Sequence, residues 1–143
     1  MSNINTSELD GFAKDLLKLA SSDLPKESKK FIRKEGKSLL QETQKEVIFS
    51  GIHHKNHTYY DSIKQGKVYK YKQNGAISNR VYSSDPKSHL LEDGHRMITH
   101  NGKEVGFVEG YHVFKNSAKS FESTFNSDCE EFVENTVIKG LSE

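Results

Sequence analysis

The chain has 143 residues, of which 33% are hydrophobic and 29% are charged, and this predicts one domain with a small core and a highly charged surface. Its net charge of +1 argues against a protein that binds polyanions over its whole surface, and its single cysteine, Cys129, excludes an internal disulfide. The first residues show no signal-peptide pattern and no apolar run approaches the roughly 20 residues that span a bilayer, so we expect a protein made in the cytoplasm without membrane contact.

Two helices are predicted in the first third of the chain. Apolar residues spaced by three and four from Leu9 to Ala20 predict a short amphipathic helix that ends at Ser21–Asp23. A second helix should begin near Pro25, which suits a first turn, and run to about Phe49. Gly36 interrupts this helix, and a close approach of another element would explain it. The polar face of the second helix carries six basic residues: Lys26, Lys29, Lys30, Arg33, Lys34 and Lys37.

The middle of the chain predicts two β-hairpins. Residues 50–65 are expected to form a polar connection, after which GKVYKYK at 66–72 has the period of a strand. Asn74-Gly75 predicts a tight turn into a second, antiparallel strand over 76–82. Asn101-Gly102 predicts a second hairpin between residues 97–98 and 105–107.

A short helical turn over Ser88–Asp93, closed by Gly94, is predicted between the hairpins. The last element should be a long helix from about His112 to Ile138, with Gly140 as its stop. We therefore expect an α+β fold, with two N-terminal helices and one long C-terminal helix packed on a small antiparallel sheet. The chain is expected to be a single domain (1–143) with three parts: helical 1–49, sheet with a short helical turn 66–110, and C-terminal helix 112–139.

The charge is unevenly divided along the chain. Residues 1–72 carry fourteen Lys/Arg and nine Asp/Glu, whereas residues 73–143 carry seven and eleven, so the halves have net charges of +5 and −4. This pattern fits two solvated faces of opposite sign. It also fits head-to-tail attraction between copies of the chain, as in a heterologous interface that closes a ring.

Histidines suggest two metal-site hypotheses, and neither is favoured. The first group, His53, His54 and His57, lies in a predicted loop without a second ligand pair. The second, His89 with Glu92 and His95, would need a continuous helix, which Gly94 should end. We expect no metal and no cofactor, and a structural or interface role for the segment that contains His89, Glu92, Gly94, His95 and Arg96.

Catalytic patterns are also weak. Cys129 falls on the apolar stripe of the last predicted helix, which is typical of an unreactive core thiol. The sequence contains neither a G-x-S-x-G nucleophile elbow nor a phosphate-binding glycine loop. We therefore expect a protein that is not an enzyme.

The strand at 66–72 interleaves lysines with tyrosines. Lys67, Lys70 and Lys72 could lie in water on an ordinary two-faced strand, or they could contact nucleic acid through phosphate charge while the tyrosines stack. In a ring around a DNA channel, such lysines would read shape and charge without a base code.

Several segments occur in a recognisable order between Thr58 and Gly140. They are TYYDSIKQGKVYKYK, NRVYSS, HLLEDGHRMI, GKEVGFVEGYHVF and a Phe-rich closing helix. In this order the chain resembles the phage tail-completion or head–tail joining family, the minor tail components of siphophages, contractile-tailed phages and defective Bacillus-type prophages. The positions that match the family's motifs are Ser62, Ile63, His89, Leu90, Glu92, Gly94, His95, Gly106, Phe107 and Gly110. One departure is Thr58-Tyr59, where many members have Thr-Gly, so the chain there should bend differently.

The resemblance implies a non-catalytic subunit of a virion neck, assembled in the host cytoplasm as a ring, hexameric more readily than dodecameric. Its partners would be further copies of itself, a head connector, and the tail terminator, tube and sheath, with non-specific contact to DNA in the channel. A second hypothesis is a small nucleic-acid-acting protein, such as a toxin-type RNase or a DNA-binding module, and it rests on the Lys/Tyr strand and the histidines.

Overall fold

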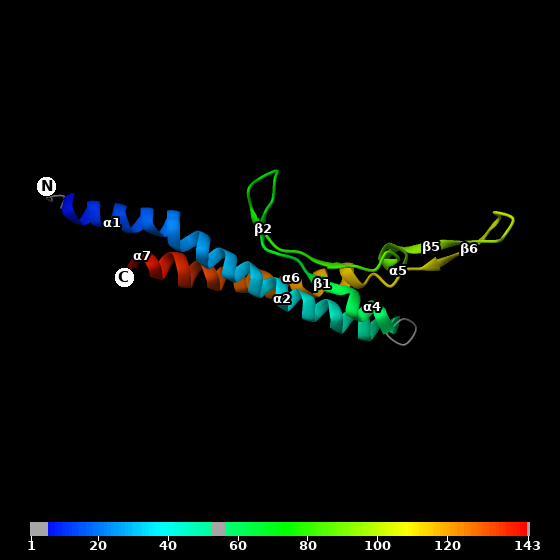
Figure 1. Cartoon of the computed structure of the whole chain (residues 1–143). Helices are drawn as coiled ribbons and strands as arrows, with labels where there is room; N and C mark the ends of the chain where they lie inside the picture. The colour runs from blue at the N-terminus through cyan, green and yellow to red at the C-terminus, as the bar shows by residue number, and fades with distance from the viewer. Residues whose placement is uncertain (1–5, 53–56, 143) are drawn as a thin grey trace.

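A computed structural model of the chain describes residues 6–52 and 57–142, and its longest elements are helices (Figure 1). Helix α1 (Thr6–Lys18) continues through a π-helical turn, η1 (Leu19–Asp23), into α2 (Leu24–Ser50). The predicted break at Ser21–Asp23 is therefore wrong. The Ser21 hydroxyl donates to the Leu17 carbonyl at 2.7 Å, so this residue bonds back onto the preceding turn. Pro25, which has no N–H to donate, comes just after the π-helical turn.

Helix α2 packs antiparallel against the C-terminal helices, α6 (Val113–Phe132), η2 (Val133–Ile138) and α7 (Lys139–Ser142). At one end the buried Thr43 hydroxyl donates to Ser117 Oγ at 3.2 Å. At the other, the rings of Phe31 and Phe132 stack with their centroids 4.5 Å apart. The long C-terminal helix is thus confirmed. Its expected stop is wrong, because α7 passes through position 140.

The strands form three separate two-stranded antiparallel sheets. They are β1 (Ile63–Gln65) with β4 (Val81–Ser83), β2 (Tyr69–Lys70) with β3 (Ile77–Ser78), and β5 (Gly94–Ile98) with β6 (Glu104–Glu109). The α+β fold class is confirmed, but the expectation of one small sheet is corrected to three. In addition, α2 makes its main contact with α6, so the long helices pack on each other and not on a broad sheet.

The first predicted hairpin exists but is interrupted. Its strands pair as β1–β4 near the helices and as β2–β3 toward the turn, with a shifted register between the two parts. In the gap the Asn79 side chain donates to the Gly66 carbonyl at 2.8 Å, and this bond replaces regular ladder pairing. The strand expected over 66–72 is therefore shortened to β2, with β1 lying before it, and the strand expected over 76–82 is split into β3 and β4. We call the β2–β3 part, residues 67–78, the lysine arm.

The predicted polar connection at 50–65 is wrong in its described part. It contains α4 (His57–Ser62) and β1, and it supplies three of the most buried side chains in the described chain, Ile52, Tyr59 and Ile63. These pack with Val47 and Val113 into the core, which lies at the end of α2 beside the start of α6. Polar residues surround these three residues in the sequence, so their spacing did not predict that they are buried. His53 and His54, from the first histidine group, lie outside the described residues.

Helix α5 (Ser88–Asp93) is the predicted short turn, and it joins the first hairpin to the second. The second hairpin, β5–β6, extends away from the helices with its turn at Asn101-Gly102, as predicted (Figure 1). Among the described helices, none has the length and apolar character needed to cross a membrane.

Candidate functional site

The β5–β6 hairpin, residues 94–109, is the most exposed part of the described chain, and we call it the apolar arm. Every residue of β6 is exposed, and its large side chains Val105 and Phe107 are 58% and 56% exposed. On β5, Met97 and Ile98 are 48% and 58% exposed. An isolated two-stranded hairpin is marginally stable in water, and a monomer rarely exposes contiguous apolar surface without a partner. The arm is therefore the strongest candidate for an interaction surface.

The base of the apolar arm is firmly attached to the body. The Tyr111 N–H donates to the Leu91 carbonyl at 2.8 Å, and the His112 N–H donates to the Glu92 carbonyl at 3.1 Å. Two glycines permit this crossing of chains. A Cβ on Gly94, which has φ +85°, would meet the Val108 carbonyl, and a Cβ on Gly110 would meet the Glu92 carbonyl.

Glu92 also fixes the start of α6. Its two carboxylate oxygens accept hydrogen bonds from the backbone N–H groups of Phe114 at 2.9 Å and Lys115 at 3.0 Å. Residue His112, which precedes the helix, has φ +53° and makes no side-chain cap, so Glu92 supplies the cap from another element. The negative charge also interacts favourably with the positive end of the helix dipole.

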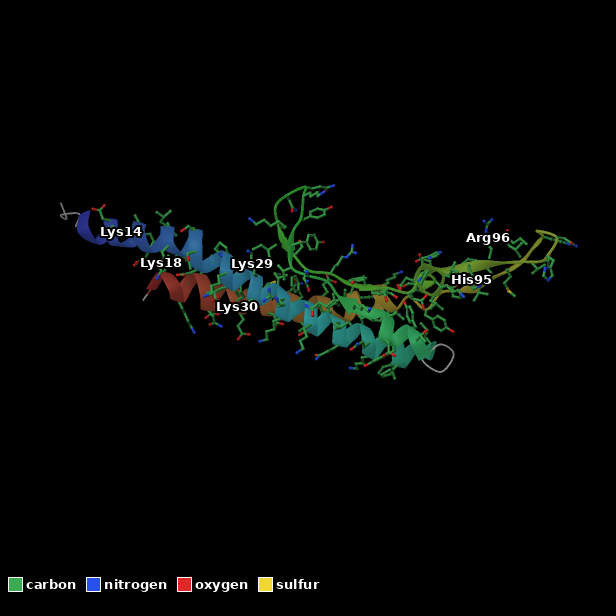
Figure 2. The ribbon with its side chains drawn as sticks, viewed as in Figure 1. Lys14, Lys18, Lys29, Lys30, His95 and Arg96 are labelled. Carbon is green, nitrogen blue, oxygen red and sulfur yellow. The ribbon has the colours of Figure 1, made fainter. Side chains whose placement is uncertain are left out.

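The structure separates the roles within the 89–96 segment. Glu92 is a structural cap and Gly94 is a close-approach glycine, whereas His89, His95 and Arg96 are exposed. Figure 2 shows His95 and Arg96 on the apolar arm, beyond the end of the helix pair. Over residues 6–52 and 57–142, no three His, Cys, Asp or Glu side chains lie together in a way that could hold a metal ion.

The lysine arm projects sideways from the middle of the helix pair, whereas the apolar arm extends beyond one end of it (Figure 1). Lys67, Lys70 and Lys72 are exposed on it, as are the rings of Tyr69 and Tyr71, at 42% and 41%. The lysines lie in water, as an ordinary two-faced strand would have them, and the tyrosines on the other face are partly exposed as well. The arm presents cationic and aromatic groups to the same solvent.

The helix pair carries opposite charges along its two members. Six exposed basic residues occupy 24–37 of α2, whereas 122–134 of α6 and η2 hold five acidic residues and no basic one. These stretches lie alongside each other because the helices are antiparallel. None of those six basic residues makes an ion pair with α6 or η2. The two stretches, which we call the basic flank and the acidic flank, are therefore available to partners. Figure 2 shows Lys29 and Lys30 on the basic flank and Lys14 and Lys18 on α1.

A groove of about 560 Å³ lies between α2, α6 and β3. Its apolar lining includes Ile32, Leu39, Ile77, Phe121 and Phe125. Gly36 forms part of its wall, and a Cβ there would meet the side chains of Asn79 and Gln65. The predicted close approach at Gly36 is therefore confirmed.

One wall of the groove contains a buried carboxyl group that sequence reasoning missed. Glu35 is 5% exposed, and its Oε2 has no hydrogen-bond partner. Burial, followed by a hydrogen bond with Asp128 and the charge of Asp128, raises the pKa of Glu35 to about 7, against a smaller opposing effect of Lys34. Burial and these two carboxyl groups also raise the pKa of the neighbouring Cys129 thiol, which disfavours the reactive thiolate. In the sequence, Glu35 stands between Lys34 and Gly36 in a stretch rich in basic residues, and no local pattern there indicates its burial.

Comparisons with models of protein families, with curated proteins and with solved structures find no match to this chain.

Proposed function

We propose that this chain is a non-enzymatic structural subunit of the neck of a phage or phage-like particle, where copies form a ring that joins the tail to the head connector. The observation that carries the proposal is the apolar arm. It holds exposed Met97, Ile98, Val105 and Phe107 on a hairpin whose base is held rigidly by Glu92, Gly94 and Gly110. Such a subunit is complete only when other chains cover the arm.

The charged flanks support contact between copies. A basic flank over 24–37 and an acidic flank over 122–134 are different surfaces of one body, and no ion pair among the described residues joins the basic residues of one to the acidic residues of the other. Attraction between two different surfaces of identical subunits gives a heterologous interface, which closes into a ring when the rotation permits. A hexamer is the expected order, and this number rests on the family resemblance.

The lysine arm supports contact with DNA inside the ring. Its exposed Lys67, Lys70 and Lys72 would meet phosphates, and Tyr69 and Tyr71 would add apolar contact. The binding would be independent of sequence, which is what a conduit for a whole genome requires. The ends of the ring would face a head connector on one side and the tail terminator, tube or sheath on the other.

The decisive experiment removes the gene from a strain that produces the particles. We expect filled heads and free tails that fail to join, and complementation with the intact gene should restore whole particles. Gold-labelled antibody against the chain should mark the neck of complemented particles in negative stain. Normal particles from the deletion strain, or label on the capsid or the tail tip, would refute the proposal.

A second candidate is a nucleic-acid-acting protein, and the exposure of Tyr69 and Tyr71 beside Lys70 favours it. It is tested by incubating the purified chain with RNA and DNA, with and without a divalent metal. Cleavage that disappears in both His57→Ala and His95→Ala would favour a nuclease over the neck subunit. Weak, salt-sensitive binding without cleavage is what the neck subunit predicts.

A further inference from the structure

Two apolar surfaces of this chain are uncovered, and they have opposite shapes. The apolar arm is a projecting hairpin, whereas the groove between α2, α6 and β3 is a hollow lined by Ile32, Leu39, Phe121 and Phe125. The groove receives no side chain of the arm, because none of the arm's residues lines it. Each surface would lose exposed apolar area if something filled or covered it.

We propose that the apolar arm of one copy seats in the groove of the next copy, so that each subunit of the ring gives an arm and receives one. The inference rests on the proposed ring and identifies the surfaces that close it. An arm and a groove on different parts of one chain form a heterologous contact, which is the kind that builds rings.

The apolar arm does not fill the groove of its own chain. Its base is fixed by the Glu92 cap on α6 and by two glycines at a chain crossing, Gly94 and Gly110. From this base the arm extends away from the stretch of helix pair that forms the groove (Figure 1). Any occupant from an arm of this kind would therefore come from another molecule, and each further copy of the chain carries the same arm.

One face of the arm has the right chemistry for the groove. Arg96 and Phe107 are register partners across β5 and β6 and share a face, and Ile98 follows next to them on β5, just past a register shift between Met97 and Ile98. Phe107 and Ile98 would supply the apolar anchors for a groove lined by Phe121 and Phe125.

Charge also matches across the proposed contact. Arg96 is 67% exposed and has only a long ion pair with Glu104, at 3.9 Å. At the groove, Glu122 and Lys119 are both exposed, and Glu35 contributes a buried carboxyl group to the wall. An arginine that arrives with the arm would pair with the exposed carboxylate of Glu122, which is the partner we assign to it.

Site-directed crosslinking tests the contact directly. In a Cys129→Ser background, one batch carries Ile98→Cys on the arm and a second, of different tagged length, carries Ser78→Cys at the groove. When the two batches are mixed and oxidised, a disulfide should link the arm of one copy to the groove of the other and give a dimer of two different tagged chains. The control pairs Ile98→Cys with Ile138→Cys, which is 58% exposed on η2 but outside the groove, and it should crosslink about tenfold less.

A charge swap provides an independent readout by mass photometry. Arg96→Glu and Glu122→Arg should each weaken self-association about tenfold or more, and the double swap should restore most of it. Both sites are exposed, so neither change should unfold the chain. Crosslinking above the control together with rescue supports the inference.

A failure of the arm-in-groove contact can be distinguished from a failure of the proposed neck role. Rings that form without the Ile98–Ser78 crosslink and without charge-swap rescue overturn the arm-in-groove contact and leave the ring intact. A chain that gives no crosslink above the control in any assembly state overturns the inference too. The proposed neck role is then judged separately by the gene deletion and the gold label.

Discussion

Glu92 and Phe114 lie 22 residues apart in the chain, yet the Glu92 carboxylate accepts the Phe114 N–H at 2.9 Å and so caps the longest C-terminal helix from outside. A second bond, from the Lys115 N–H at 3.0 Å, uses the other oxygen. The same residue's carbonyl accepts the His112 N–H, so one glutamate ties together α5, the base of the apolar arm and α6.

Replacing Glu92 with alanine should therefore cost stability. The change removes the acceptor for two backbone N–H groups and the favourable charge at the helix start, so we expect a loss of about 1–2 kcal/mol in the free energy of unfolding. Urea denaturation followed by circular dichroism measures it. Glu92→Gln, which keeps one acceptor oxygen, should lose less. His89→Ala, an exposed change on the same short helix, serves as the control and should be nearly neutral. Equal effects of the Glu92 and His89 substitutions would contradict the capping role.

Gly36 should tolerate alanine poorly, whereas Gly11 should accept it. A Cβ at position 36 would displace the Asn79 side chain and meet Gln65 Nε2 at 2.7 Å. That Gln65 amide donates to the Arg33 carbonyl and to Asn79 Oδ1, each at 2.8 Å, so the new methyl breaks a connected set of bonds.

We expect Gly36→Ala to destabilise the chain by about 1–3 kcal/mol. Gly11→Ala has nothing within 4 Å of the added Cβ, and it should stabilise by up to about 1 kcal/mol because alanine favours a helix. Thermal melts of the two variants beside the wild type decide the matter. A Gly36→Ala variant that gains as much as Gly11→Ala would show that the close approach costs nothing.

The lysine arm should carry the salt-dependent part of any duplex binding. Changing Lys67, Lys70 and Lys72 together to glutamine should reduce the slope of log K against log salt by up to about 3, because each phosphate contact contributes about 0.9. Fluorescence anisotropy with a labelled duplex at several salt concentrations gives the slope. Glutamine at the exposed Lys87, Lys103 and Lys115 matches the charge change elsewhere. If both triple variants lose slope equally, the arm has no special part in binding.

The sequence predicted the helices well, because long apolar periodicities leave few alternatives. Leu24–Ser50 and the C-terminal helix occur close to where the spacing placed them, and both hairpin turns occur at their Asn-Gly pairs. The break at Ser21–Asp23 was wrong, because serine can bond to the preceding turn as well as end a helix.

Tertiary contacts account for most of the other errors. Tyr59 is fully buried in a stretch that looked like a polar loop, and its hydroxyl lies 3.2 Å from Ser88 Oγ, so its polar end is satisfied inside the body. The split of the first hairpin depends on the Asn79 side chain, which periodicity does not report. For the 89–96 segment, the sequence predicted a structural or interface role without choosing among five residues, and the partner of Glu92, 22 residues away, could not be read from local spacing.

Glu35 provides a prediction about pH whose sign follows from its surroundings. Burial first, and then the Asp128 carboxyl group, raise the Glu35 pKa from 4.5 to about 7. Between these values the folded chain keeps a proton that the unfolded chain has released, so stability falls as pH rises through this window. The contribution of Glu35 to the free energy of unfolding is complete below about pH 4.5 and is lost above about pH 7. Because one pKa unit corresponds to about 1.36 kcal/mol, the total loss is up to about 3 kcal/mol.

Glu35→Gln imitates the protonated form and should remove most of this slope. We expect the variant to match the wild type near about pH 4 and to exceed it at about pH 8 by up to about 3 kcal/mol, as measured from urea midpoints across the range. Glu42→Gln, a like change two turns along the same helix, should leave the slope in place. If the Glu35→Gln and wild-type curves instead run parallel from pH 4 to 8, Glu35 is not the proton-binding group, because a neutral amide cannot titrate.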